Sequence, residues 1–141
     1  NLCKCPKTES EAKKIAEKFD AILQLLEMTS RMKDFYDIYY LSNMFDFDGR
    51  KLQEAIFETL QNRGTTYNRD SLEKIAAFAN DSQMISKWNL YLRTIKMSRL
   101  EFNTVIKSIY EFLKPVWKAI INECECFEYW DKTGGKWEEY C

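Results

Sequence analysis

The chain has 141 residues, of which 45% are hydrophobic, so it fits one domain long enough to bury a core. Its 21 lysines and arginines nearly balance its 22 aspartates and glutamates, which excludes an overall basic surface for nucleic acid or an anionic membrane. Histidine is absent, which excludes imidazole as a general base or metal ligand and leaves carboxylates, lysines and thiols.

Helical periodicity dominates the sequence. Only four glycines and two prolines interrupt it, and apolar residues recur at helical spacing through most of the chain. We therefore predict an all-α fold, a bundle of about six helices with a short C-terminal hairpin or tail. The first helix is predicted over residues 9–28, and the second over residues 31–45, after a turn at Thr29 and Ser30.

Capping residues mark the next helices. Asp48 is placed to cap a third helix, and Gly64 would end it by adopting a positive φ. Asp70 and Glu73 resemble a capping box that opens a short fourth helix. A fifth helix then carries four apolar residues at helical spacing: Ile85, Trp88, Leu92 and Ile95.

The most regular apolar pattern runs from Phe102 to Ile120, after a second capping box made by Ser98 and Glu101. Pro115 is expected to kink or restart this sixth helix. The remaining segment is aromatic on both sides of Gly134-Gly135, which is typical of a small hairpin or an ordered tail.

Three charged residues lie where apolar residues are expected. Lys18 falls within the apolar arc of the first helix, and Asp34 lies in line with the apolar face of the second, with Asp37 beside it. One interpretation is a buried ion pair that fixes how the two helices align. The other is a cleft in which the aspartates hold a metal or take a proton while Lys18 grips a phosphate.

A family resemblance covers nearly the whole chain. The main segments that carry it are Ala16-Glu17-Lys18-Phe19-Asp20-Ala21, Ser30-Arg31-Met32-Lys33-Asp34-Phe35-Tyr36-Asp37-Ile38-Tyr39 and Phe45-Asp46-Phe47-Asp48-Gly49. Weaker support comes from Arg63-Gly64-Thr65, the run Phe112-Leu113-Lys114-Pro115-Val116 and the aromatic tail. These segments resemble the C-terminal half of the AbiEii/AbiGii-type nucleotidyltransferase toxins of bacterial type IV toxin-antitoxin and abortive-infection systems.

The resemblance implies an enzyme that transfers a nucleotide from a nucleoside triphosphate to an acceptor, with Mg²⁺ as the divalent metal. It implies Lys18 as a catalytic or phosphate-contacting lysine and Asp34 as a catalytic carboxylate, supported by Asp37. Arg31 and Lys33 would bind the nucleotide. It also implies an antitoxin partner and an RNA acceptor as candidates.

Two parts of such a transferase are missing from this sequence. Transferases of this kind open with a small sheet that carries a Gly-rich phosphate turn and an acidic pair for the metals. Asp46 and Asp48 superficially mimic the pair, but Gly49 opens a helix directly after them, so capping is the favoured role. We assign no metal ligand within the chain.

We therefore predict that residues 1–141 form a single helical domain, the C-terminal part of a longer protein. An N-terminal nucleotidyltransferase core or a separate subunit would complete its site, and Mg²⁺ and nucleotide would bind weakly without it. The alternative is a non-catalytic helical module that binds an antitoxin, a subunit or RNA. The first function predicts an open groove at the charged residues, and the second predicts no solvent path to them.

The aromatic stripe of the second helix has two interpretations, packing or base stacking, of which packing is favoured. It consists of Phe35, Tyr36, Tyr39 and Tyr40.

The five cysteines lie only near the chain ends and do not resemble a secreted disulfide framework. Cys3, Cys5, Cys124 and Cys126 could form a tetrathiolate zinc site, although unrelated free thiols are favoured because the Cys-x-Cys spacing is tight. No apolar run approaches the roughly 20 residues that span a bilayer, and no signal peptide is recognisable. We predict a cytoplasmic protein without membrane contact.

Overall fold

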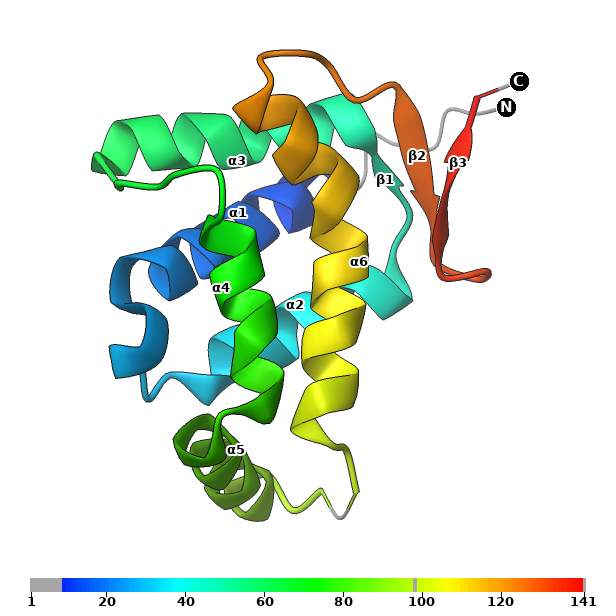
Figure 1. The fold of residues 1–141 in the computed structure, drawn as a ribbon. Helices are drawn as coiled ribbons and strands as arrows, with labels where there is room; N and C mark the ends of the chain where they lie inside the picture. Colours follow the sequence, from blue (N-terminus) through cyan, green and yellow to red (C-terminus); the bar gives the residue numbers. More distant parts are fainter. Residues whose placement is uncertain (1–8, 98, 141) are drawn as a thin grey trace.

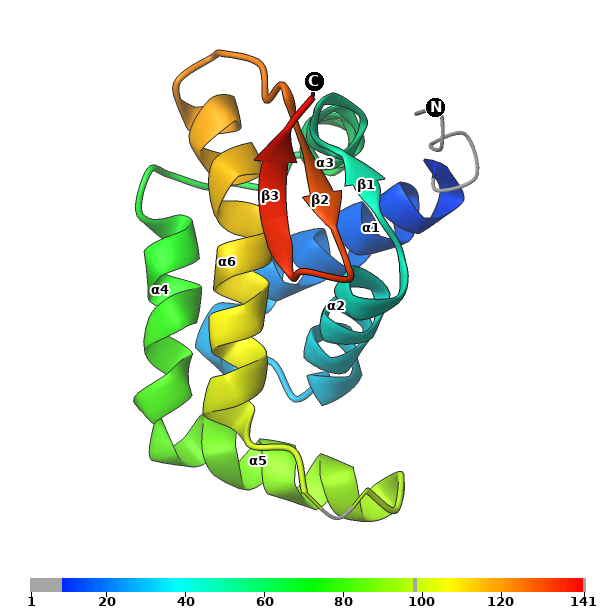
Figure 2. The same ribbon diagram turned by 90° about the vertical axis from the view of Figure 1, so that its right-hand side faces the viewer.

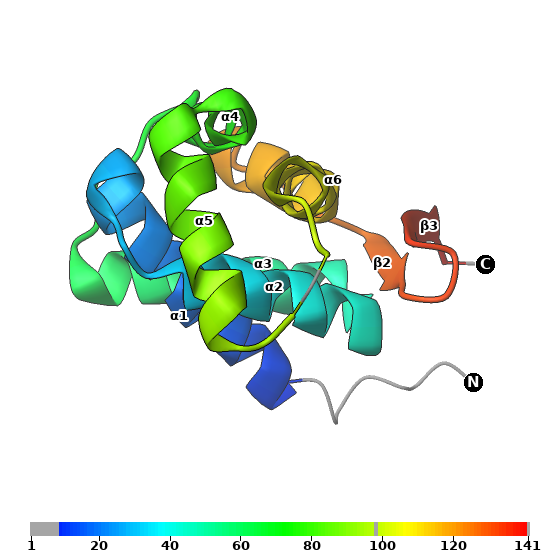
Figure 3. The same ribbon diagram turned by 90° about the horizontal axis from the view of Figure 1, so that it is seen from below.

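The chain folds into two groups of helices with a small sheet at one edge. The structure, a computed structural model, describes residues 9–97 and 99–140, and these contain six α-helices (Figure 1). Seen from the end that carries α5, α1, α2 and α3 lie on one side and α4 and α6 on the other (Figure 3). The helices are α1 (Glu9–Leu25), α2 (Met32–Met44), α3 (Gly49–Arg63), α4 (Ser71–Ala77), α5 (Ser82–Thr94) and α6 (Phe102–Ile121).

The predicted all-α class is confirmed, and most predicted helices are found near their expected positions. The first helix is shorter than predicted, because Leu26 takes a φ of 49° and the chain tightens into the 3-10 turn η2 (Leu26–Met28). Asp48 caps α3 as predicted, accepting a hydrogen bond of 3.0 Å from the Lys51 backbone. Gly64 ends α3 with a φ of 64°, also as predicted.

The capping box predicted at α4 is wrong. Asp70 precedes α4, but its backbone (φ −99°, ψ 14°) is not extended and its side chain makes no capping bond. Glu73 instead accepts a 2.6 Å hydrogen bond from the Tyr110 hydroxyl. After the 3-10 turn η3 (Phe78–Asn80), Asp81 caps α5 by accepting from the backbones of Gln83 and Met84, which the sequence analysis missed.

Helix α6 is the centre of the core. It packs against α2, α3, α4 and α5 and buries one apolar face along its whole length. It begins at Phe102 with Glu101 as N-cap residue, although Glu101 makes no side-chain capping bond; Ser98, the other half of the predicted box, lies outside the described residues. The helix continues through Pro115 without restarting, because the carbonyl that loses its partner belongs to exposed Glu111. None of the described helices is both long and apolar enough to cross a membrane.

The predicted C-terminal hairpin is confirmed, and it joins a third strand that the sequence analysis missed. The sheet is antiparallel, in the order β1-β2-β3, with Phe47 opposite Trp130 and Trp130 opposite Trp137. It lies beside α6, at the end of the molecule away from α5 (Figure 2). Indole N–H groups of Trp130 and Trp137 donate to the carbonyls of Ser42 (2.7 Å) and Phe112 (2.9 Å). The strands are β1 (Phe47–Asp48), β2 (Glu128–Asp131) and β3 (Lys136–Glu139).

Gly49 permits the close approach of α3 to the hairpin. A Cβ atom at this position would lie 2.5 Å from the Glu128 carbonyl oxygen and 2.6 Å from the Cys126 sulfur. Both distances are too short for a side chain, so the first residue of α3 must be glycine for β1 and β2 to pair.

We expect Gly49→Ala to lower the free energy of unfolding by about 1–3 kcal/mol, the usual cost of overpacking a close contact. Urea denaturation followed by circular dichroism measures this change. Gly134→Ala is the matched control, because a Cβ there would lie 3.4 Å from the Asp131 carboxylate, an ordinary contact. Equal unfolding midpoints for the two variants would contradict the steric argument.

Candidate functional site

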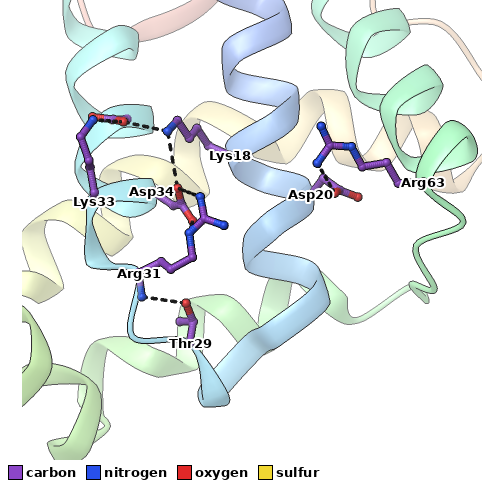
Figure 4. Close-up of polar contacts among 8 residues, drawn as sticks. Lys18, Asp20, Thr29, Arg31, Lys33, Asp34 and Arg63 are labelled. Carbon is purple, nitrogen blue, oxygen red and sulfur yellow. Dashed lines mark hydrogen bonds and ion pairs between the residues drawn. The ribbon is translucent and has the colours of Figure 1, made fainter.

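Charged side chains of α1 and α2 converge at one edge of the helix pair (Figure 4). The Lys18 ammonium lies 3.1 Å from Asp37 Oδ2 and 3.6 Å from Asp34 Oδ1. The three residues marked by the sequence analysis as misplaced charges are therefore brought together. The long side chain of Lys18 spans the gap between the two helices.

Arg31 and Lys33 form the outer rim of this charged cluster. Arg31 Nε lies 3.1 Å from Asp34 Oδ2, an ion pair without hydrogen-bond geometry, and Arg31 Nη2 donates to Asp34 Oδ1 at 3.4 Å. Lys33 Nζ donates to Asp37 Oδ2 at 2.8 Å. The side chains of Arg31 and Lys33 are 58% and 66% exposed, so both cations face solvent.

Burial increases from the rim to the base of the cluster. The side chain of Asp34 is only 2% exposed, whereas Asp37 and Lys18 keep 19% and 28%. The cluster is thus neither the open groove nor the sealed ion pair that the two predicted functions require. Water reaches Lys18 and Asp37 at the edge, and Asp34 lies beneath them.

Burial also sets the electrostatics of the cluster. It raises the pKa of Asp34, against the opposing effects of the Arg31 and Lys18 charges, and the Asp37 charge raises that pKa further. The hydrogen bond from Lys33 to Asp37 raises the pKa of Lys33. A carboxyl that holds its proton more tightly than usual therefore lies within contact distance of two cations.

The turn before α2 fixes the rim. Thr29 is 1% exposed, and its hydroxyl accepts a 2.9 Å hydrogen bond from the Arg31 backbone. Lys87 of α5 donates to the Thr29 carbonyl at 2.8 Å and to the Glu27 carbonyl at 3.4 Å. A third helix thus holds the turn from which Arg31 reaches Asp34.

Comparison with known proteins identifies the family. The model of a family described as "Nucleotidyl transferase AbiEii toxin, Type IV TA system" matches residues 7–120. The chain belongs to this AbiEii family. A search of curated proteins and a search of solved structures each give no match. The match spans α1 to nearly the end of α6 and includes the whole charged cluster.

Membership of the AbiEii family makes the chain nucleotidyltransferase-like and places it among the toxins of type IV toxin-antitoxin systems. A toxin of such a system has an antitoxin partner. Nucleotide substrates and divalent metals are general properties of nucleotidyltransferases.

The sequence analysis missed a second buried carboxylate in this AbiEii-family chain. Asp20 is fully buried and lies on the other side of α1 from Lys18 (Figure 4). It accepts a 2.9 Å hydrogen bond from Gln24 and another from the Thr65 hydroxyl, and it lies 3.5 Å from Arg63 Nη1. Two sequence signals could have revealed it. Asp20 lies in line with the buried apolar residues of α1, and its partners belong to the Arg63-Gly64-Thr65 segment that supports the family resemblance. The contacts tie the segment after α3 to α1.

Both members of the acidic pair, Asp46 and Asp48, make structural hydrogen bonds. The sequence analysis favoured helix capping for this pair, and Asp48 has that role. Asp48 caps α3, and Asp46 Oδ1 accepts a 3.0 Å hydrogen bond from the Lys132 backbone in the hairpin loop. Neither carboxylate belongs to the charged cluster. Among the described residues, no three carboxylates or thiols are grouped so that they could hold a metal. Asp34 and Asp37 alone, both paired with cations, do not fit a divalent metal.

The cysteines near the C-terminus differ in environment. Cys124 is exposed, whereas Cys126 is 6% exposed, and burial raises the pKa of its thiol. Cys3 and Cys5 lie outside the described residues, so the tetrathiolate zinc site stays a prediction.

We expect Asp34→Asn to change how stability depends on pH. The raised pKa means that the folded state binds the Asp34 proton more tightly than the unfolded state does. The wild type therefore loses stability as the pH rises from the ordinary value of 3.8 through the raised pKa, whereas the amide of the variant cannot titrate. Urea unfolding at a series of acidic pH values should show that the free energy of unfolding of the variant rises relative to that of the wild type as the pH rises.

Glu58→Gln, an exposed change on α3, corrects this comparison for the loss of one negative charge. If the free energy of unfolding of Asp34→Asn, relative to that of the wild type, stays constant or falls as the pH rises, the effect of burial is contradicted.

Proposed function

We propose that this chain is the helical C-terminal part of an AbiEii nucleotidyltransferase and contributes Lys18, Asp34 and Asp37 to its active site. An N-terminal core, in the same protein or a separate subunit, would complete the site. The observation that carries the proposal is the convergence of these three side chains at a partly solvated edge, within the segment that matches the family.

Each side chain has a role that its surroundings suit. Lys18 is a compact cation at the surface, able to exchange an aspartate partner for a phosphate oxygen. Asp34 is sheltered from water and has a raised pKa, which suits a group that takes a proton from an acceptor hydroxyl. Asp37 holds Lys18 in place through their 3.1 Å contact.

Arg31 and Lys33 would bind the nucleotide from the rim. Their side chains are more than half exposed, so phosphate can reach them without disturbing the core. The charged cluster contains three cations and two carboxylates, which leaves a positive balance for a polyphosphate.

The divalent metal, Mg²⁺ in this proposal, would be held by the core. The charged cluster offers only two carboxylates, both paired with cations, and no described group of three possible ligands exists, which is too few for a metal on this chain alone. Nucleotide and metal binding should therefore appear only in the completed protein.

The non-catalytic module remains the second candidate function because Asp34 is almost fully buried between cations. A structural ion pair needs such burial and compensation. In that case the chain would bind the antitoxin, another subunit or RNA, and the charged cluster would only align α1 with α2.

The deciding experiment titrates a nucleoside triphosphate and Mg²⁺ into this chain by calorimetry or NMR, alone and with the core domain. We expect binding only with the core, and its loss in Lys18→Ala and in Asp34→Asn. Lys13→Ala is the matched control, because Lys13 is exposed on the same helix and five residues from Lys18, on another face.

A completed protein whose nucleotide binding and transfer survive Lys18→Ala and Asp34→Asn would overturn the catalytic assignment. If neither sample binds and Asp34→Asn only shifts the melting temperature, the charged cluster is structural and the second function replaces the first.

A further inference from the structure

Three tyrosine rings form a ladder across α2 and α5. Tyr36 and Tyr40 are stacked, with centroids 6.2 Å apart and planes 24° from parallel. The ring centroid of Tyr91, in α5, lies 6.3 Å from that of Tyr36 and 5.6 Å from that of the buried Trp88. The ladder therefore has a rigid base in the core and leads outward to Tyr40.

The outer part of the tyrosine ladder is open to solvent. Tyr40 is 47% exposed, and Tyr36 and Tyr91 are half-buried. Their hydroxyls make no hydrogen bond to any residue that the structure describes, in contrast to Tyr110, which donates to Glu73. Packing, the favoured interpretation from sequence, accounts for the inner rings but not for the exposed face of Tyr40.

The tyrosine ladder is continuous with the charged cluster. Lys33, Tyr36, Asp37 and Tyr40 are spaced by three and four residues, which places them on one face of α2. Tyr91 is close enough to this face for the charges of Asp37 and Lys33 to act on it. The exposed ammonium of Lys33, paired with Asp37, thus adjoins the tyrosine rings on one short stretch of surface.

We propose that the tyrosine ladder binds single-stranded nucleic acid, with a base stacked on the exposed ring of Tyr40 and the phosphates beside Lys33 and Arg31. Every base has a flat face, so aromatic rings next to cations bind single strands with little regard to sequence. This inference rests on the proposed function, since a strand bound there would lead its end toward Lys18 and Asp34.

The test is fluorescence anisotropy with the full 141-residue chain and a labelled RNA of about ten uridines, within the usual site size for stacking proteins, at low salt. We expect salt-sensitive binding, weakened about tenfold by Tyr40→Ala and retained in Tyr40→Phe, which keeps the ring. Lys33→Met should reduce the slope of affinity against salt by roughly one. A duplex of the same length should bind more weakly because its bases are already stacked.

Phe57→Ala is the control, since Phe57 is a 44% exposed aromatic on α3. The proposal is overturned if the oligonucleotide does not bind, if the duplex binds equally well, or if Tyr40→Ala and Phe57→Ala behave alike. It is also overturned if Tyr40→Ala impairs binding of ATP but not of the strand, which would assign the ladder to the nucleotide base.

Failure here is separable from failure of the proposed function. Strand binding is read without the core or metal, whereas the catalytic assignment is read from Lys18→Ala and Asp34→Asn in the completed protein. Loss of nucleotide binding in those variants, together with unchanged strand binding in Tyr40→Ala, would reject only the ladder.

Discussion

The buried carboxylate of Asp34 constrains the arrangement of three helices. A charge removed from water must be compensated, and Lys18 of α1 and Arg31 at the start of α2 provide this compensation. Arg31 can do so only if the turn before α2 is fixed, and Lys87 of α5 holds that turn through the Thr29 carbonyl. The same placement of α5 brings its aromatic side chains against α2. One carboxylate thus links the charged cluster to the aromatic surface beside it.

Local sequence signals predict the helices well and the sheet only in part. Helix α6 has a long periodic apolar face, and α3 has both its cap at Asp48 and its stop at Gly64. Asp70 and Asp81 look alike in sequence, yet only Asp81 has the extended backbone of a capping residue. Strand β1 is very short and pairs with a strand distant in the sequence, so no local sequence pattern predicts it.

The candidate site is predictable to a similar degree, for a physical reason. A helical wheel reveals Lys18 and Asp34 because a charge in an apolar arc needs a partner. It does not reveal whether that arc ends at solvent, because exposure depends on which other helices cover the edge. The wheel therefore left the choice between an open groove and a sealed ion pair undecided. Asp20 escaped notice because its partners, Arg63 and Thr65, lie 43 and 45 residues further along the chain.

The hairpin engages one of the carboxylates that could otherwise belong to an active site. It lies beyond the family match, at residues 128–139, yet it pairs with β1 inside the match and is fixed by indole hydrogen bonds to α2 and α6. Its loop backbone engages Asp46, and Asp48 is taken by the α3 cap. Asp20 is likewise committed to its own contacts. Of these aspartates, Asp34 and Asp37 are then the two that share the partly exposed cation Lys18. Two carboxylates can orient a lysine and accept a proton, but a metal site needs more oxygen ligands, which is the physical reason to look for them on a second domain.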